Sequence, residues 1–485
     1  MHTHIAVDLG AESGRVVLGR FDGGRITLEE VRRFPTGMTA VLGHKHWNLL
    51  RLYEEMLQAF KSAATAGKIQ SVGVDSWGVD FVLLGPDGQP TGLPFAYRDS
   101  RTDGVMEKFF EIVPAAKVYA ATGIQFMQVN TLFQLFSMAA DKSPQLAAAK
   151  ALLMVPDYFH YLFTGQCSTE FTNASTTQCV NIASGRWDEN LLREVGIPAH
   201  IFQPIVPPGS KVGSLTAEMQ SLTGLGDIPV IAPASHDTAS AVAAVPAEGD
   251  DWAYISSGTW SLVGVETKQA VATPQARAFN FTNEGGVDGT TRLLKNVAGL
   301  WLVQQLRAGF DVRYDYPVLA ELAGAARPFA SMIDPDDARF LAPESMPDAI
   351  ADFCRQTGQA VPQSPGEFVR CALEGLAMQY RLVLEQLRQL RGRGVGRIHF
   401  VGGGSKNRLL CQLTADVCGL PVLAGPAEGT ALGNLIVQAI AAGHIGSLAQ
   451  GRAMIRESVE IVEYRPGPGG RIDEAWQKFL QLKAR

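Results

Sequence analysis

The stretch AVDLGAESGRVVLGRF, residues 6–21, places Asp8 between two runs of alternating apolar residues and follows it with a glycine-containing turn. Alternating apolar residues on both sides of a tight turn predict a β-hairpin. Glycine allows the backbone to approach a ligand closely, and consecutive amides in such a turn form a concave anion site. The stretch therefore predicts a hairpin whose turn, residues 10–15, can hold an anion.

Composition limits the class of protein. The chain has 485 residues, of which 46% are hydrophobic and 19% are charged, and its formal net charge is −6. A chain of this length exceeds what one hydrophobic core usually fills, so we expect two domains. The sequence has no run of Lys or Arg residues, so its charge does not indicate a nucleic-acid partner. The sequence shows neither a secretion signal nor an apolar run long enough for a membrane span, so we expect a cytoplasmic protein.

The opening pattern recurs along the chain. Residues 69–88 predict a second hairpin with Gly78 at its bend, and residues 250–267 predict a third. Residues 130–154 have helical spacing, and a strand, a loop and a helix are expected at 228–245 and again at 396–422. These echoes predict two related α/β domains, residues 1–246 and 247–485, with a central cleft between them as the place for a small ligand.

Three glycine-containing turns occupy equivalent positions in this repeated pattern. They are residues 10–15, 257–259 and 402–404. One such turn is weak evidence, because most merely connect strands. Three in a two-domain chain favour a nucleotide as the ligand.

Two aspartates supply candidate chemistry. Asp8 closes an apolar strand just before the first turn, where a carboxylate is costly unless a cation or hydrogen-bond donors compensate it. It is interpreted as a Mg²⁺ ligand, direct or through water, or as a turn residue that binds local amides. Asp237 opens a helix, which simple N-capping would also explain. The neighbouring His236 and Thr238 favour a functional site.

Several of these motifs resemble a known superfamily. AVDLGAESGR, PASHDTASAV, SSGTWSLVG and VGGGSKN are similar to the two phosphate motifs, the threonine turn and the adenosine motif of the actin-like ATPases, which have ribonuclease H-like domains. DSWGVDFVLL, GLPFAYRDSRT, TNEGG and LLKNVAGLWLVQQL resemble, within that superfamily, the FGGY carbohydrate kinases. The matches run from Ala6 to about Asn434.

The resemblance implies a reaction and a set of site residues. The reaction is transfer of the γ-phosphoryl group of ATP, with Mg²⁺, to the C1 hydroxyl of L-rhamnulose, a step in L-rhamnose catabolism. Asp237 falls on the general base, and the sugar-contacting positions are Gly78, His236, Asp237, Thr238 and Asn296. The nucleotide-contacting positions are Ala11, Glu12, Ser13, Gly14, Arg15, Thr259, Gln304 and Gly402. Most of the sugar site and the first phosphate loop would lie in the first domain, and most of the nucleotide site in the second.

The sequence departs from the family pattern at a few positions. Glu12 stands where a small hydroxyl residue is usual, and a carboxylate near phosphates is repulsive, so the turn amides rather than this side chain are expected to bind. Gln134 and Ser137 stand where the wider family has lysine and tryptophan. The branch of the family that acts on L-rhamnulose looks similar to this chain there, so the departure argues against the glycerol and xylulose branches.

Other functions stay open. The branch that acts on L-fuculose shares SHDT and SSGTW but differs at WGVDF and YRDSRT. A nucleotide-gated chaperone or filament protein can have the same fold, because fold does not determine function, but it would leave SHDT and NVAGLW without a role. A sugar-sensing repressor would need a DNA-binding module before the first hairpin, and we do not expect one there.

Overall fold

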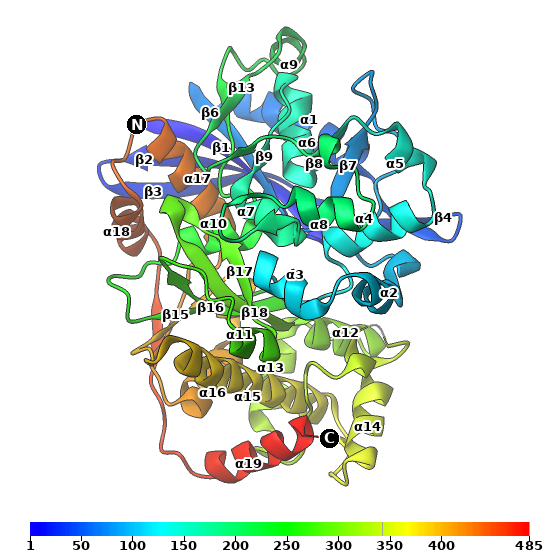
Figure 1. Ribbon diagram of the computed structural model, residues 1–485. Helices are drawn as coiled ribbons and strands as arrows, with labels where there is room; N and C mark the ends of the chain where they lie inside the picture. The colour runs from blue at the N-terminus through cyan, green and yellow to red at the C-terminus, as the bar shows by residue number, and fades with distance from the viewer. Residues whose placement is uncertain (342, 485) are drawn as a thin grey trace. The chain divides into compact units, whose positions relative to one another are not determined.

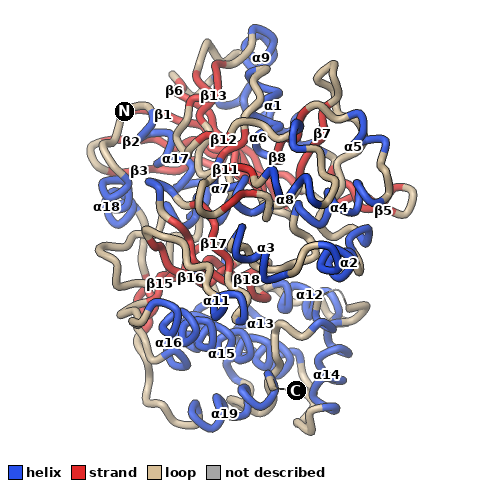
Figure 2. Tube along the Cα trace, viewed as in Figure 1, coloured by secondary structure: helices blue, strands red, loops and turns tan. Residues whose placement is uncertain are grey.

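The computed structural model describes residues 1–341 and 343–484 and divides them into two compact units. The first unit comprises residues 1–246, 266–293 and 429–458, and the second comprises 247–265, 294–428 and the chain from 459 onward. Each unit has a sheet flanked by helices, drawn in red and blue in Figure 2. The domain boundary after residue 246 stays a prediction, because two segments of the C-terminal half pack with the first unit.

The first unit is built on a six-stranded sheet in the order β13-β14-β6-β1-β2-β3. Strands β1 and β2 pair antiparallel with Asp8 opposite Arg15, which confirms the opening hairpin. Strands β6 and β14 run parallel to β1. The strand bounds are β1 His2–Leu9, β2 Ser13–Asp22, β3 Arg25–Pro35, β6 Ile69–Ser76, β13 Lys211–Ser214 and β14 Pro229–Ile231.

Strand alternation assigns the two faces of this sheet to different helices (Figure 1). On one face Ile5, Val7 and Leu9 join a core with α1 (Leu49–Ala64) and α6 (Val155–Thr164). The other face carries small and polar residues and packs on α17 (Gly429–Ala441), which itself packs on α10 (Asp237–Ala243). Successive strand side chains point to opposite faces, so Asp8 lies on the α17 side.

The predicted second hairpin at residues 69–88 is wrong. Strand β6 pairs with β1 and β14, whereas β7 (Phe81–Leu84) pairs antiparallel with β8 (Ala151–Met154) in a separate two-stranded sheet. The predicted helical stretch 130–154 is correct only for α4 (Thr131–Ala140) and α5 (Pro144–Ala148), because its end forms β8. Short apolar runs fit a helix or a strand, and here the long-range partner decides.

The second unit repeats part of this plan. Strands β15 (Ala253–Ser257) and β16 (Trp260–Thr267) form the predicted hairpin, and β19 (Ile398–Val401) runs parallel to β15. Within this unit the strands follow the order β18-β16-β15-β19-β20-β21, and β18 enters the unit at residue 294. A 3-10 turn over Gly403–Lys406 and helix α16 (Arg408–Cys418) follow β19, which confirms the predicted strand, glycine turn and helix.

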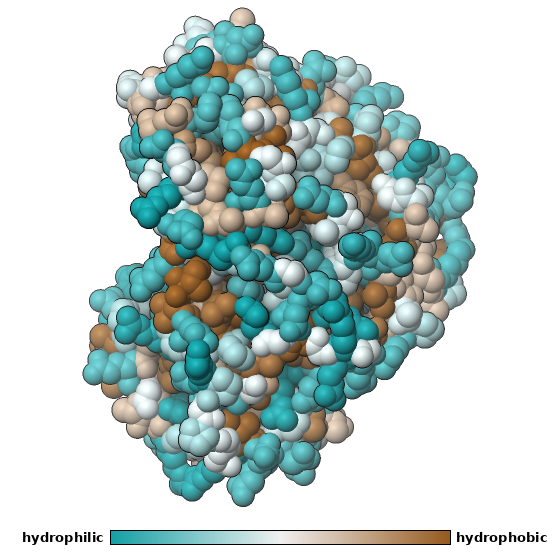
Figure 3. All heavy atoms as spheres, turned by 90° about the vertical axis from the view of Figure 1, so that its left-hand side faces the viewer, coloured by the Kyte–Doolittle hydropathy of each residue, from teal (hydrophilic) through white to brown (hydrophobic). Residues whose placement is uncertain are grey.

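The remaining elements complete both units. They include α2 Val105–Ile112, α3 Ala115–Thr122, α7 Phe171–Ala174, α8 Glu189–Glu194, α9 Ala217–Thr223, α11 Pro274–Ala278, α12 Trp301–Gly309, α13 Tyr316–Ala325, α14 Met346–Gln356, α15 Pro365–Arg391, α18 Leu448–Ser458, α19 Ile472–Lys483, β17 Thr282–Gly285, β18 Thr291–Ala298, β20 Val422–Ala424 and β21 Val462–Tyr464. On the face drawn in Figure 3, hydrophilic residues predominate and apolar side chains appear in separate groups. Among the described residues, no helix is both long and apolar enough to cross a bilayer.

Candidate active site

Three aspartates gather on the α17 side of the first unit. Asp8 on β1 and Asp75 on β6 are paired in register on adjacent parallel strands, so their side chains leave the same face. A bridge between Ser76 and His236 brings the start of α10, and with it Asp237, to the end of β6. Two of the three, Asp8 and Asp237, were predicted from the sequence.

Arg15 provides the positive charge that pairs with Asp8. Its Nε and Nη2 both donate to Asp8 Oδ2, at 2.9 and 2.6 Å. The pKa of Asp75 is raised well above its usual value by burial and by the Asp8 charge. Burial also raises the pKa of Asp237, although His236 opposes the shift. Negative charge therefore exceeds positive charge in this cluster, which favours a cation or a proton there.

Asp75 was missed by the sequence analysis. Its Oδ2 accepts a hydrogen bond from Asn434 Nδ2 of α17 at 2.5 Å, and Gln438 Nε2 in turn donates to Asn434 Oδ1 at 2.6 Å. Gln438 Oε1 accepts from Ser71, whose hydroxyl also lies 2.7 Å from His4 Nδ1. This buried polar chain holds Asp75 in place. An aspartate inside the apolar run SVGVDS was the signal that could have revealed it.

The predicted general base lies at the first position of α10. His236 is the N-cap residue and makes no side-chain capping bond, and Asp237 is the first residue of the helix. Asp237 Oδ1 accepts from the Thr238 amide at 2.5 Å and from its hydroxyl at 3.2 Å, and His236 Nε2 lies 3.4 Å from the same oxygen. All of these contacts fall on Oδ1, which leaves Oδ2 as the oxygen for a substrate proton. The Asp237 side chain is 29% exposed.

The first turn is shaped by close packing at Gly14. A Cβ on Gly14 would lie 2.5 Å from a ring carbon of Phe34, so a larger residue there would displace the packed ring. The Glu12 carbonyl accepts from the Thr36 amide, and the Glu12 side chain is exposed. Ala11 packs against the core below the turn, and Ser13 is exposed at the start of β2.

Gly78 follows β6 and packs against Thr176. A Cβ on Gly78 would lie 2.9 Å from Thr176 Oγ1, and the same hydroxyl accepts from the Val79 amide. Two residues further on, the buried Asp80 accepts from both Trp47 and Trp77 indole N–H groups, at 2.6 and 3.0 Å. Burial raises the pKa of Asp80 to about 6 against these hydrogen bonds. The contact with Thr176 and the hydrogen bonds of Asp80 therefore fix the loop that carries Gly78 on both sides.

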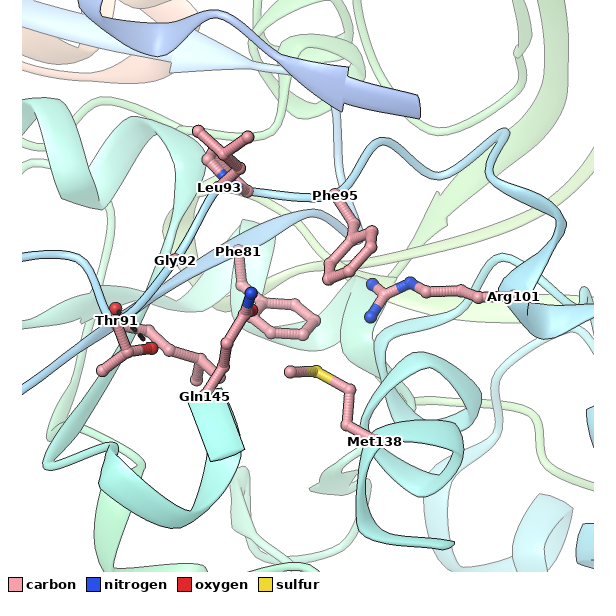
Figure 4. Close-up of a pocket in the computed structure, with 10 residues that line it drawn as sticks. Phe81, Thr91, Gly92, Leu93, Phe95, Arg101, Met138 and Gln145 are labelled. Carbon is pink, nitrogen blue, oxygen red and sulfur yellow. Dashed lines mark hydrogen bonds between the residues drawn. The ribbon is translucent and has the colours of Figure 1, made fainter. Parts of the chain in front are cut away.

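Gln134, where the wider family has lysine, is part of the same network. Its Nε2 donates to Asp80 Oδ1 at 3.1 Å, and its Oε1 accepts from Arg101. The Arg101 guanidinium carbon lies 3.9 Å from the centre of the Phe95 ring, beside a small pocket that Met138 also lines (Figure 4). A lysine at 134 would place a second cation beside Arg101 and could not accept its hydrogen bond.

The second unit carries the remaining predicted nucleotide residues. The Gly258 and Thr259 carbonyls accept from the amides that open α12, at 2.9 and 3.1 Å. Gly402 has a φ of 82°, and a Cβ there would lie 2.9 Å from the Ser257 carbonyl oxygen. The ends of β15 and β19 thus bring these two turns together. Gln304 lies on α12, and its buried Oε1 has no hydrogen-bond partner among the described residues.

Asn296 lies half-buried on β18, away from the two turns in sequence but within the same unit as Thr259 and Gly402. The structure thus groups the predicted residues in two sets. The first unit holds Asp8, Ala11, Glu12, Ser13, Gly14, Arg15, Gly78, His236, Asp237 and Thr238, and the second holds Thr259, Asn296, Gln304 and Gly402.

The carboxylates fit a magnesium ion that shares its coordination with phosphate. Mg²⁺ usually takes one or two protein carboxylates and completes its shell with water and phosphate oxygens. Asp8 and Asp75 are adjacent, and Asp75 Oδ1 is a buried oxygen without a hydrogen-bond partner in residues 1–341 and 343–484. Within those residues no group of three or more His, Cys, Asp or Glu side chains could hold a metal by itself. The donor set therefore fits a substrate-borne ion.

Two family models match the sequence. The FGGY family of carbohydrate kinases, N-terminal domain, matches residues 3–244, and the corresponding C-terminal domain matches residues 253–442. The chain belongs to the FGGY family of carbohydrate kinases, as its motifs predicted, and it is an enzyme of that class.

Curated relatives indicate which members of the FGGY family this chain is similar to. A rhamnulokinase of Bacteroides thetaiotaomicron is 48% identical over 98% of this chain and 98% of its own length. Rhamnulokinases of Pectobacterium carotovorum and Enterococcus faecalis are 44% and 43% identical, each over 99% of this chain and over 96% and 97% of their own lengths.

Solved structures confirm the predicted actin-like fold class. Xylulose kinase from Lactobacillus acidophilus matches with a TM-score of 0.82 and 16% identity, over 100% of this chain and 97% of its own. Xylulose kinase from Rhodospirillum rubrum matches with a TM-score of 0.80 and 21% identity, over 100% of this chain and 98% of its own.

Proposed function

We propose that this carbohydrate kinase transfers the γ-phosphoryl group of ATP to the C1 hydroxyl of L-rhamnulose, giving L-rhamnulose 1-phosphate and ADP in L-rhamnose catabolism. Similarity to rhamnulokinases along nearly the whole chain supports the choice of sugar. The observation that carries the chemistry is the arrangement of Asp237, whose Oδ1 is held by neighbouring groups while Oδ2 stays available. We expect the enzyme to act in the cytoplasm on small molecules, without a nucleic-acid or membrane partner.

Asp237 is the proposed general base. Phosphoryl transfer needs positioning, charge neutralisation and one group that accepts the hydroxyl proton. The raised pKa of Asp237, caused first by burial, makes its carboxylate a stronger proton acceptor than an ordinary aspartate. We propose that His236, Thr238, Gly78 and Asn296 contact the sugar and orient its C1 hydroxyl toward this carboxylate.

The nucleotide residues act through backbone and charge. We propose that the amides of residues 11–14 and the Arg15 side chain bind phosphate oxygens, and that Thr259, Gln304 and Gly402 contact the remainder of the nucleotide. Asp8 would hold Mg²⁺ directly or through water, and the ion supplies neutralisation of phosphate charge. The unpartnered Gln304 Oε1 is an acceptor suited to a nucleotide N–H or O–H donor.

A panel of ketoses tests this proposal. Purified enzyme, ATP and Mg²⁺ are mixed with L-rhamnulose, L-fuculose, D-xylulose or no sugar, and ADP release is followed together with the ³¹P spectrum of the product. We expect slow ATP hydrolysis alone, strong stimulation by L-rhamnulose and a primary phosphate at C1. Preference for L-fuculose would retain the kinase but overturn the sugar. Turnover that ignores every sugar would favour a nucleotide-gated binding protein.

A further inference from the structure

A buried ion pair lies behind His236 on the side away from Asp237. Arg292 on β18 is fully buried, and its Nη2 lies 3.0 Å from Glu284 Oε2 on β17. Its Nε donates to the Gly285 carbonyl at 2.8 Å, which fixes the plane of the guanidinium group. The same Nη2 lies 3.0 Å from His236 Nδ1. Neither Glu284 nor Arg292 was assigned a role by the sequence.

The chemistry of arginine determines which ring nitrogen of His236 carries the proton. A guanidinium group donates hydrogen bonds and cannot accept them. A contact of 3.0 Å between Arg292 Nη2 and His236 Nδ1 therefore requires a lone pair on Nδ1. A neutral imidazole whose Nδ1 accepts has its proton on Nε2. That nitrogen lies 3.4 Å from Asp237 Oδ1.

Glu284 competes for the same nitrogen and would impose the opposite arrangement. Its Oε2 lies 3.3 Å from His236 Nδ1, and accepting a hydrogen bond from the ring would require a proton there. The arginine contact is shorter, and Glu284 Oε2 already accepts from Arg292. Although burial alone would raise the pKa of Glu284, the Arg292 charge holds that pKa below its usual value, and a hydrogen bond from His236 would add to this only in the competing Nδ1–H form. Glu284 is thus an ionised partner that keeps Arg292 in position.

We propose that Arg292, held by Glu284, is a positioning residue that locks His236 in the Nε2–H tautomer and so keeps the protonated nitrogen next to Asp237 Oδ1. The positive end of this N–H dipole stabilises the ionised carboxylate and leaves Oδ2 to accept the sugar proton, a catalytic consequence that rests on the proposed function. The charged groups that face His236 are Arg292 from β18, Glu284 from β17 and Asp237 from α10.

The ¹⁵N spectrum of the imidazole measures the tautomer directly in the full-length protein. With ¹⁵N-histidine labelling at mildly alkaline pH, the His236 signals are assigned by their loss in His236→Gln. We expect an unprotonated Nδ1 and a protonated Nε2 in the sugar-free enzyme. A protonated Nδ1 would overturn the proposal, because Glu284 would then be the partner of the ring.

Variants of the ion pair separate the two partners. Glu284→Gln keeps the shape and should leave the proton on Nε2, whereas Arg292→Leu leaves Glu284 alone with the ring and should place a proton on Nδ1. Arg292→Lys keeps a donor-only cation and should restore the wild-type signature. For Arg292→Leu we expect kcat to fall about tenfold or more with little change in the KM for ATP.

Replacing only one residue of the buried Arg292–Glu284 pair can unfold the chain. A double variant keeps the proposal testable in that case. Arg292→Met with Glu284→Leu removes both charges, and such replacements often preserve stability. We expect both His236 tautomers to become populated and kcat to fall; an unchanged Nε2–H signature with normal kcat would overturn the proposal. Glu374→Gln, at the buried Arg370–Glu374 pair of the second unit, is the matched control and should leave the His236 spectrum unchanged.

The spectrum of the free enzyme tests the tautomer, and the ketose panel tests the function. A correct tautomer in an enzyme that phosphorylates no ketose would retain the positioning role of Arg292 and contradict the proposed reaction. A kinase with Nδ1 protonated would retain the reaction and contradict the positioning role.

Discussion

The two units contribute different chemistry to the predicted site. In the first unit the site residues are ionisable and crowded, with three aspartates near one Arg15 charge and a histidine held by a buried ion pair. In the second unit they are glycine turns and the two side-chain amides of Asn296 and Gln304, and Gly402 has a backbone conformation that favours glycine. Charge changes in the first unit should therefore affect proton transfer and metal use. Changes of shape in the second unit should affect nucleotide binding.

The largest expected effect comes from removing the proton acceptor in the first unit. Asp237→Asn keeps the size of the side chain but cannot take the hydroxyl proton, so we expect kcat to fall by roughly 10²- to 10⁴-fold with little change in the KM for ATP. Steady-state kinetics with both substrates measures this. Asp227→Asn, at an exposed position before β14, is the control and should behave as wild type. Normal kcat in folded Asp237→Asn would leave the first unit without a base.

The fall of activity at acid pH gives a second test of Asp237 as the base in the first unit. Asp237 must be ionised to act, and its pKa is raised above 3.8 mainly by burial. Activity should therefore be full above that raised pKa and fall about tenfold per pH unit below it. The kcat/KM of the wild type, measured against pH with stability checked at each point, tests the sign. A profile that stays flat down to the ordinary pKa of an aspartate would contradict the assignment.

A substitution that changes the backbone shape of a glycine turn in the second unit should weaken ATP binding rather than proton transfer. Gly402→Ala adds a Cβ 2.9 Å from the Ser257 carbonyl oxygen at a φ of 82°. Strain of about 1–3 kcal/mol would displace the turn, so we expect the KM for ATP to rise about tenfold. The KM for the sugar should change less. Gly403→Ala is a matched control, because a Cβ there meets nothing within 4 Å. Equal effects of the two variants would remove the special role of Gly402.

The metal proposal predicts a smaller change. Asp8→Asn removes a charge that would help to hold Mg²⁺, so the Mg²⁺ concentration for half-maximal turnover should rise about three- to tenfold. A Mg²⁺ titration at fixed ATP measures it, with Asp22→Asn at the exposed end of β2 as the control. An unchanged midpoint would leave Asp8 as a turn residue paired with Arg15.

The smallest effect concerns stability rather than turnover. Gln134→Leu leaves the buried Asp80 Oδ1 without its donor and removes the acceptor for Arg101. We expect the free energy of unfolding to fall by about 1–3 kcal/mol. Thermal melts measure the loss, and Gln128→Leu, which removes an exposed hydrogen bond to Asp103, is the control. Equal melting temperatures for the two variants would contradict a structural role for Gln134.

Local sequence patterns predicted much of the fold but little of the polar network. The hairpins at β1–β2 and β15–β16 and the strand, turn and helix after β19 are local structures, so alternation and glycine placement identified them. The hairpin expected at Gly78 failed because β6 and β7 take partners from other parts of the chain. Apolar periodicity indicates that a strand is buried, but it does not indicate which strand pairs with it.

Contiguous motifs were enough to assign the FGGY family, the class of enzyme and the candidates His236, Asp237 and Thr238. The place of Asp75 beside Asp8 and the contact of Arg292 with His236 became known only from the folded chain. Asp75 and its partner Asn434 are 359 positions apart, and Arg292 and His236 are 56 apart. Contacts of this kind depend on parallel strand pairing and on helix packing against the sheet, which bring together side chains that no local pattern connects.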